Sequence, residues 1–287
     1  MYLDFRYYCP TSIAELLDLM SEPGEYLIYS GGTDLLVQLR AKELSAKYLI
    51  DIKQIPELNV ISETDTHITI GAAVCFTEIA GNEQVAKWAS ALQEAALTVG
   101  SVQIRNKATL GGNIQTASPA GDGLVAALGL DGEVSLLSAT GQRRLPLAEF
   151  IVGPRETALK PGEVMTEIRI PKHDWCCQRF FKVGRRNALA ISVVNGLVAL
   201  KTNAEGIVEE ARVALGAVAP TPVRICEAER VLIGQMPDME RIKQVKEIVK
   251  DCIHPISDIR ASAAYRRYIA GVMVGCQINT FREGCIV

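Results

Sequence analysis

The N-terminal part of the chain alternates apolar stripes of helical spacing with short apolar runs. Residues 11–20 carry an apolar stripe behind a Thr-Ser pair that can cap a helix, which predicts an amphipathic helix. After a turn at residues 23–24, the run YLIYS at residues 26–30 predicts a strand that ends at a Gly-Gly pair. The next residues, 34–44, predict a short helix, and YLIDI at residues 48–52 predicts a second strand.

The middle of the chain contains both helical spacing and strand-like alternation of apolar residues. The alternation of apolar and polar residues in HITIGAA predicts a strand with one solvent-exposed face. The long apolar stripe before Gly100 predicts a helix that ends at this glycine. A hairpin is predicted to turn at Thr140–Gly141. The predicted elements are strand 67–73, helix 85–99, an apolar run 124–130, the hairpin segments 133–139 and 142–150, and strand 163–172.

Beyond a boundary near residues 173–177, strands come first and helices follow. This order predicts an antiparallel sheet with helices on one face, an α+β arrangement. The predicted strands are 180–183, 192–200 and 210–215, with a turn at 203–206, and the predicted helices are 224–233, 239–252 and 261–278.

Composition and charge narrow the classes of partner. The chain has 287 residues, is 48% hydrophobic and 22% charged, and is long enough for two domains. Its formal net charge of −3, with both signs interspersed, gives no footprint for nucleic acid. We find neither a signal-peptide pattern nor an apolar run of membrane-spanning length, so we expect a cytoplasmic protein without a membrane partner.

Cysteines and histidines give no metal pattern. The eight cysteines are scattered without a C-x-x-C motif, and no two of the three histidines are spaced for metal binding. We therefore predict reduced cysteines of mostly hydrophobic character, structural histidines and no metal ligand.

Two glycine-rich segments stand out against this background. One is YSGGTDLL at residues 29–36, and the other lies within residues 97–122, where Gly111 and Gly112 are surrounded by hydroxyl and amide side chains. Glycines that adopt positive φ or allow close approach, beside short polar side chains, are typical of a phosphate cradle. Two such segments suggest one ligand with two phosphates, held from two sides. Neither GxGxxG nor GxxxxGK[ST] occurs, so the common nucleotide-binding folds are not indicated.

At this level of detail the chain resembles a known family. YSGGTDLLVQLR and QIRNKATLGGNIQTASPAGD, in this order and at this separation, resemble the two signature segments of the FAD-binding (medium) subunits of molybdenum hydroxylases. The likeness continues through EIRIPK, FFKVGRRNALAIS and GAVAPTPVR, so it covers essentially the whole chain.

The resemblance implies an α+β fold of the vanillyl-alcohol-oxidase or p-cresol-methylhydroxylase type. Two α/β subdomains would enclose FAD, and a C-terminal α+β domain with an antiparallel sheet and helices would follow. We place FAD-binding subdomain 1 at residues 1–54, subdomain 2 at residues 55–174 and the C-terminal flavoprotein domain at residues 175–287.

The resemblance also implies a role for individual positions. The first segment would wrap the pyrophosphate from one side and the second would meet it from the other. Asp122 would accept hydrogen bonds from the adenosine ribose, Ile104 would pack beside the flavin, and Lys182 would lie near the isoalloxazine. The implied cofactor-binding set is Ser30, Gly31, Gly32, Thr33, Asp34, Leu35, Ile104, Thr109, Gly111, Gly112, Asn113, Ser118, Asp122, Val164, Met165 and Lys182.

Several of these residues have an alternative explanation. Asp34 can instead cap the helix that follows it, and Lys182, in the apolar strand FFKV, can instead extend to solvent. Arg105 can be a surface ion-pair partner, and Arg185–Arg186 can form a solvated turn rather than part of an electron-transfer surface.

The implied function is electron transfer by non-covalently bound FAD, since no histidine stands in either glycine segment to anchor flavin. The molybdenum cofactor would be on a large partner subunit and [2Fe–2S] clusters on a small one, with NAD+ as a possible acceptor and xanthine dehydrogenase as the nearest type. No catalytic residue is expected, because the flavin supplies the redox chemistry. The alternatives are a self-contained FAD oxidoreductase of the same fold, which would need a substrate pocket with a base, and a non-redox adaptor, which would not need the glycine segments.

Overall fold

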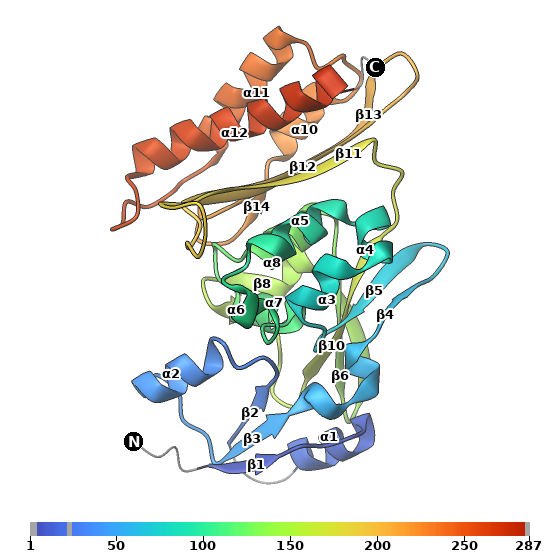
Figure 1. The fold of residues 1–287 in the computed structure, drawn as a ribbon, viewed down its shortest axis with the longest axis vertical. Helices are drawn as coiled ribbons and strands as arrows, with labels where there is room; N and C mark the ends of the chain where they lie inside the picture. The colour runs from blue at the N-terminus through green and yellow to red at the C-terminus, as the bar shows by residue number, and fades with distance from the viewer. Residues whose placement is uncertain (1–4, 22–24, 285–287) are drawn as a thin grey trace.

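The computed structural model describes residues 5–21 and 25–284 and stacks three main sheets with helices between and above them (Figure 1). The turn predicted at residues 23–24 lies outside the described residues. Across these two ranges, no helix has both the length and the apolar character needed to cross a membrane.

The N-terminal sheet is parallel and small. Its strand order is β1-β3-β2, and β3 pairs in parallel with both neighbours. The first helix begins where Ser12 Oγ accepts the amide of Glu15, and its Leu16 and Met20 are buried against Ile50 and other residues. The elements are β1 (Arg6–Tyr8), α1 (Ile13–Ser21), β2 (Tyr26–Tyr29), α2 (Leu35–Ala41) and β3 (Tyr48–Asp51). Two 3₁₀ turns, η1 (Ile52–Gln54) and η2 (Pro56–Asn59), lead to the next sheet.

The second sheet is antiparallel in all its pairings and has the order β4-β5-β10-β6-β7. The predicted hairpin at Thr140–Gly141 is confirmed, since Ser138 pairs with Gly141 at its end. The strands are β4 (Ile61–Glu63), β5 (His67–Gly71), β6 (Glu133–Ser138), β7 (Gly141–Pro146) and β10 (Val164–Pro171), with a small separate pair of β8 (Ile151–Gly153) and β9 (Glu156–Thr157).

The helices of this region depart from the prediction. The single helix predicted at 85–99 is two helices, because the backbone of Ala89 leaves the helical region at φ −139° and ψ 49° while its side chain is fully buried. Residues 124–130 are also helical, as are residues 102–105 and 110–116 of the second glycine-rich segment. The helices are α3 (Phe76–Gly81), α4 (Glu83–Trp88), α5 (Ser90–Thr98), α6 (Val102–Arg105), α7 (Leu110–Thr116), α8 (Asp122–Gly129) and α9 (Leu147–Phe150).

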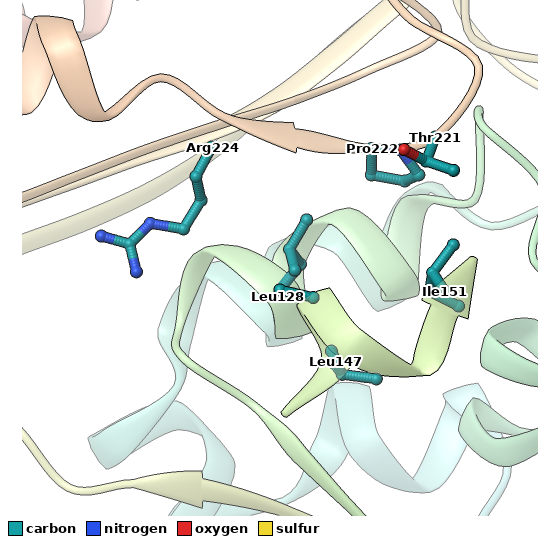
Figure 2. A pocket seen from close by; sticks show the side chains of 7 residues that line it. Leu128, Leu147, Ile151, Thr221, Pro222 and Arg224 are labelled. Atoms are coloured by element: carbon teal, nitrogen blue, oxygen red, sulfur yellow. The ribbon is translucent and has the colours of Figure 1, made fainter. Parts of the chain in front are cut away.

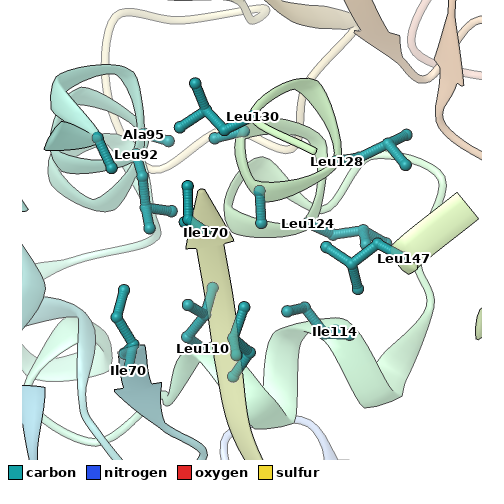
Figure 3. Packing of buried hydrophobic residues seen from close by; sticks show 14 of the residues in the cluster. Ile70, Leu92, Ala95, Leu110, Ile114, Leu124, Leu128, Leu130, Leu147 and Ile170 are labelled. Atoms are coloured by element: carbon teal, nitrogen blue, oxygen red, sulfur yellow. The ribbon is translucent and has the colours of Figure 1, made fainter. Parts of the chain in front are cut away.

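Helix α8 lies at the centre of the molecule, and every one of its residues is buried. Its side chains pack with those of α5, α7 and β10 in the largest hydrophobic cluster, as Figure 3 shows for Leu124, Leu128 and Ile170. Leu197 and Ala214 of the third sheet belong to the same cluster. The region of the second sheet and the C-terminal region therefore share this hydrophobic cluster.

The third sheet is antiparallel with the order β11-β12-β13-β14, and helices cover its outer face (Figure 1). Asp238 caps α11 by accepting the amide of Arg241, and Val245 and Val249 of that helix are buried against the sheet. The predicted α+β arrangement is confirmed. The elements are β11 (Cys177–Val183), β12 (Val194–Thr202), β13 (Val208–Gly216), β14 (Val223–Arg224), α10 (Cys226–Leu232), α11 (Met239–Cys252) and α12 (Ala263–Gly284).

Each of the three main sheets falls within one of the three ranges predicted as domains. We keep the boundaries at residues 54/55 and 174/175 as a proposal.

Candidate functional site

The two glycine segments lie in direct contact. A Cβ atom added to Gly31 would lie 2.0 Å from the carbonyl oxygen of Lys107 and 2.8 Å from Cα of Ala108, just before Thr109. Only glycine allows the two backbones to approach this closely. The next residue, Gly32, has a φ of +67°, which glycine adopts without strain. The sequence therefore predicts correctly that these distant segments come together.

Asp34 forms a second link between the segments. Its carboxylate Oδ2 accepts hydrogen bonds from Thr116 Oγ1, at 3.4 Å, and from Gln38 Nε2. Asp34 is the N-cap residue of α2, but its side chain makes no capping hydrogen bond. The capping alternative for Asp34 is therefore wrong. Its carboxylate links the two segments instead.

The glycine pair in the second segment belongs to a helix, which corrects the expectation of positive φ. Thr109 is the N-cap of α7, where its Oγ1 accepts the amide of Gly112 at 3.1 Å, and neither glycine has positive φ. A Cβ on Gly111 would lie 2.5 Å from the carbonyl oxygen of Ala72, whereas one on Gly112 would meet only Thr109 Oγ1, at 3.0 Å. Gly111 therefore allows close packing, and Gly112 leaves space at the surface.

Ser30, beside Gly31, shows that the segment fits a polar ligand. Its Oγ is buried and has no hydrogen-bond partner, an arrangement that costs free energy unless a partner is supplied. A phosphate oxygen is a ligand that could supply the missing partner of this hydroxyl. The neighbouring Thr33 and Leu35 are half-buried in the same loop and the start of α2.

Asn113 and Ser118 shape the turn between α7 and α8. Asn113 Oδ1 accepts the amide of Leu124 at 2.9 Å, and Ser118 Oγ accepts the amide of Ala120 at 3.3 Å. The first bond satisfies a backbone donor in the first turn of α8, which otherwise lacks a partner, and the second holds the turn that precedes the helix. The two side chains therefore fix the position of Asp122, the first residue of that helix.

Asp122 and Lys182 form a buried ion pair at the junction of α8 and the third sheet. Lys182 Nζ lies 2.5 Å from Asp122 Oδ2 and also donates to the carbonyl of Thr98 at 3.0 Å. Only 14% of the lysine side chain and 7% of the aspartate side chain are exposed. The alternative in which Lys182 extends to solvent is therefore wrong.

Three neutral donors complete the surroundings of this carboxylate. Ser192 Oγ and Asn195 Nδ2 donate to Asp122 Oδ1 at 2.8 and 2.6 Å, and Thr98 Oγ1 lies 3.4 Å from Oδ2. A ribose hydroxyl that binds Asp122 would have to replace one of these donors. Sequence analysis missed all three, since they lie far from Asp122 along the chain.

The residues predicted beside the isoalloxazine lie in two kinds of surroundings. Ile104 on α6 is 38% exposed, so its side chain is open to a ligand. Val164 and Met165, at the start of β10, are only 3% and 6% exposed and belong to hydrophobic clusters. Contact of these two residues with the flavin stays a prediction, and their side chains leave little surface for it.

The arginines left open by the sequence hold backbone carbonyls. Arg105 Nη1 donates to the carbonyls of Val99 and Gly100, so the surface ion-pair explanation is not what the structure shows. Arg185 and Arg186 likewise donate to carbonyls in loops of the C-terminal domain.

A cavity of about 100 Å³ lies elsewhere, between α8, α9 and β14, as Figure 2 shows. Leu128, Leu147 and Arg224 line it with neighbouring residues, and none of the glycine-segment residues takes part. This cavity lies at the boundary between the two regions that carry the second and third sheets.

The sequence matches the family model described as the FAD binding domain in molybdopterin dehydrogenase over residues 3–173. This chain belongs to the family of FAD-binding subunits of molybdenum hydroxylases. A second model, the CO dehydrogenase flavoprotein C-terminal domain, matches residues 179–279. The chain is accordingly an oxidoreductase subunit with FAD as its cofactor, and the predicted family, fold class and cofactor are confirmed.

The chain matches several known relatives along almost their whole length. It is 34% identical to the nicotinate dehydrogenase FAD-subunit of Eubacterium barkeri, covering 92% of this chain and 91% of the relative. It is 31% identical to the glyceraldehyde dehydrogenase medium chain of Sulfolobus acidocaldarius, covering 98% of each chain. The structure of carbon monoxide dehydrogenase from Hydrogenophaga pseudoflava matches with a TM-score of 0.89 and 29% identity over 96% of each chain.

Proposed function

We propose that this subunit transfers electrons within a heteromeric molybdenum hydroxylase. It would accept them from [2Fe–2S] clusters on a small subunit, while a large subunit carries the molybdenum cofactor, and would pass them to NAD+ or another acceptor. The observation that carries the proposal is the contact of the two glycine segments at Gly31, next to the unpartnered Ser30 hydroxyl, in a chain that matches the family over residues 3–173 and 179–279.

The residues of the chain would bind and orient the cofactor. Residues 30–35 would hold the pyrophosphate from one side, with Thr109 and residues 111–113 on the other and Ser118 nearby. Ile104 would offer an apolar contact. Lys182 and Asp122 are paired at 2.5 Å, so both would face the same part of the cofactor, and their expected roles at the isoalloxazine and at the adenosine ribose do not both fit an extended FAD. When bound, FAD supplies both one-electron and two-electron redox chemistry.

The self-contained oxidoreductase is less well supported. Asp122 and Lys182, the buried charged residues of the site, are paired with each other, so neither is free to act as a substrate base. The segment GAVAPTPVR resembles xanthine dehydrogenase members of the family, which favours a purine as the substrate of the complex, but relatives named for nicotinate and glyceraldehyde match this chain as well. We propose that the molybdenum subunit selects the substrate and that the complex is cytoplasmic.

Anaerobic reduction tests this function. The flavin absorbance near 450 nm of the complex purified with its molybdenum and iron–sulfur subunits should bleach when substrate is added, whereas that of the isolated subunit should not. Candidate substrates would include a purine, nicotinate and an aldehyde. An isolated chain that is reduced by substrate and turns over alone would overturn the proposal in favour of the self-contained enzyme.

A further inference from the structure

The carboxyl ends of β2 and β3 carry a cluster of aromatic and charged side chains beside the first glycine segment. β2 ends at Tyr29 and β3 ends at Asp51, and these two residues are partners in the parallel pairing. The glycine segment continues from β2, and Lys53 follows β3 in the turn η1. Ligands of open parallel sheets bind outside the carboxyl ends of the strands. The cluster therefore lies at the edge of the sheet where a cofactor is expected.

The ring of Tyr29 supports the glycine segment directly. A Cβ atom added to Gly32 would lie 2.3 Å from Cε2 of Tyr29 and 2.9 Å from its hydroxyl oxygen. The ring thus fills the space that a side chain at position 32 would occupy. Glycine at this position allows both the φ of +67° and the close contact. The position of the ring therefore affects the course of the backbone through residues 31–33, at the centre of the predicted pyrophosphate segment.

Lys53 and Tyr7 hold the Tyr29 ring in place. The ammonium nitrogen of Lys53 lies 4.6 Å from the centroid of the ring, which is the geometry of a cation–π contact. The ring of Tyr7 packs edge-on against the same ring, with the centroids 6.3 Å apart and the planes at 72°. The Tyr29 ring is therefore confined by Gly32, Lys53 and Tyr7.

Asp51 fixes both residues that hold the ring. Its Oδ2 lies 3.3 Å from Lys53 Nζ and accepts the hydroxyl of Tyr7, and its Oδ1 accepts the backbone amide of Lys53 at 3.0 Å. Only 5% of the Asp51 side chain is exposed, so separating this carboxylate from its charged partner would be costly. The Lys53 ammonium is therefore held over the ring, where it supports Tyr29, and is not free to move to a phosphate.

We propose that Lys53 is a positioning residue for FAD binding, because it holds the first glycine segment, through the Tyr29 ring, in the conformation that receives the pyrophosphate. A segment already ordered in its bound conformation binds more tightly, since less conformational freedom is lost on binding. The inference rests on the proposed function, in which residues 30–35 hold the pyrophosphate, and adds to that site a residue outside both glycine segments.

FAD titration of Lys53 variants tests this role. In the complex co-produced with the molybdenum and iron–sulfur subunits and freed of FAD, Lys53→Met should raise the dissociation constant for FAD about tenfold, because the ring is no longer fixed. Lys53→Arg should bind FAD within about twofold of wild type, since a guanidinium also stacks on an aromatic face. Flavin fluorescence measures the binding.

Lys87→Met is the matched control. Lys87 Nζ also lies 4.6 Å from the centroid of an aromatic ring, that of Trp88. Trp88 belongs to α4, however, and donates its indole N–H to Glu63 of β4. Lys87→Met should therefore leave FAD binding unchanged. Urea unfolding of both variants without FAD checks that each chain is folded.

Tyr29→Leu shows whether Lys53 acts through the ring. This variant should weaken FAD binding about as much as Lys53→Met does, since the support beside Gly32 is lost in both. The double variant should bind FAD no more weakly than Tyr29→Leu alone, because the two residues act as one unit.

The outcomes separate this inference from the proposed function. Equal FAD binding by wild type and Lys53→Met overturns the inference and leaves the electron-transfer function intact, as does a double variant whose loss is the product of the two single losses. Lys53→Arg that binds as weakly as Lys53→Met excludes the cation over the ring as the cause. Tight FAD binding by folded Tyr29→Leu overturns the inference even where Lys53→Met does not fold. A wild-type complex that takes up no FAD overturns both proposals.

Discussion

At the residue scale, Gly111 and Gly112 show how two identical neighbours can have different tasks. Gly111 is packed against the backbone of Ala72, whereas Gly112 faces Thr109 Oγ1 alone. The sequence indicates that glycine matters in this segment but cannot separate close packing from open space, because the contact with Ala72 depends on a segment far away along the chain.

The two glycines should respond differently to a single added methyl group. Gly111→Ala should lower the free energy of unfolding by about 2 kcal/mol, since the added Cβ overlaps a backbone oxygen. Gly112→Ala should change it by less than about 1 kcal/mol, because the threonine hydroxyl can move aside and alanine favours a helix. Urea unfolding followed by circular dichroism measures both. Equal losses of stability in the two variants would contradict this assignment.

The family resemblance pointed to side chains that the structure brings together, whereas local sequence patterns did not. It pointed to both Asp122 and Lys182, but not to their pairing, and the local alternatives for Asp34 and Lys182 both proved wrong. Ser192 and Asn195 could not be predicted, because their contact with Asp122 exists only after β12 packs on α8.

At the element scale, the longer strands, α2 and the C-terminal helices followed from periodicity, whereas α6 and α7 of the second glycine segment did not. α11 was predicted at its observed bounds from its apolar spacing. α7 was missed because glycines disfavour a helix in isolation, and here Thr109 capping and burial outweigh that preference. The break at Ala89 has no sequence signal, since alanine is the best helix former.

The loop between α11 and α12 should show a defined pH dependence through Asp258. Burial by itself raises the pKa of this carboxyl, but the hydrogen bonds from the Arg260 amide and the Arg266 guanidinium outweigh burial and hold the pKa well below its usual range. A depressed pKa in the folded state contributes stability above the unfolded value of about 4, and this stability is lost as the pH falls below it.

Asp258→Asn should therefore lower the free energy of unfolding by about 2 kcal/mol at pH 7, the usual size for hydrogen bonds to a charged group. The difference from wild type should shrink as the pH is lowered below about 4. Thermal unfolding across this range measures it. A difference that is constant from neutral to acid pH would exclude the charged carboxylate as the cause.

At the scale of the whole molecule, the ion pair of Asp122 and Lys182 joins two domains that also share a hydrophobic core. Replacing one partner leaves the other charged and buried, so Asp122→Asn and Lys182→Met should each cost about 3 kcal/mol. The double variant should cost clearly less than the sum of the two. A double-mutant cycle from chemical denaturation measures the coupling, and strictly additive losses would contradict a direct pair.

The order of strands and helices predicted the C-terminal layer from the sequence, but not the way the layers stack. The stacking depends on α8, whose apolar run was visible while its burial on every side was not. The first glycine segment follows β2 of the N-terminal sheet, whereas the second includes α7, which packs against β10 of the second sheet, so the stacking is also what brings the site together.

The most direct test of the central claim is FAD binding to the flavin-free chain, measured as the quenching of flavin fluorescence. Gly112→Val would fill the open face of the site, where an added Cβ meets only Thr109 Oγ1, and Gly81→Val, where an added Cβ meets nothing within 4 Å, is the matched control. We predict that wild type and Gly81→Val bind FAD tightly, while folded Gly112→Val does not. Undiminished FAD binding by Gly112→Val would contradict the account.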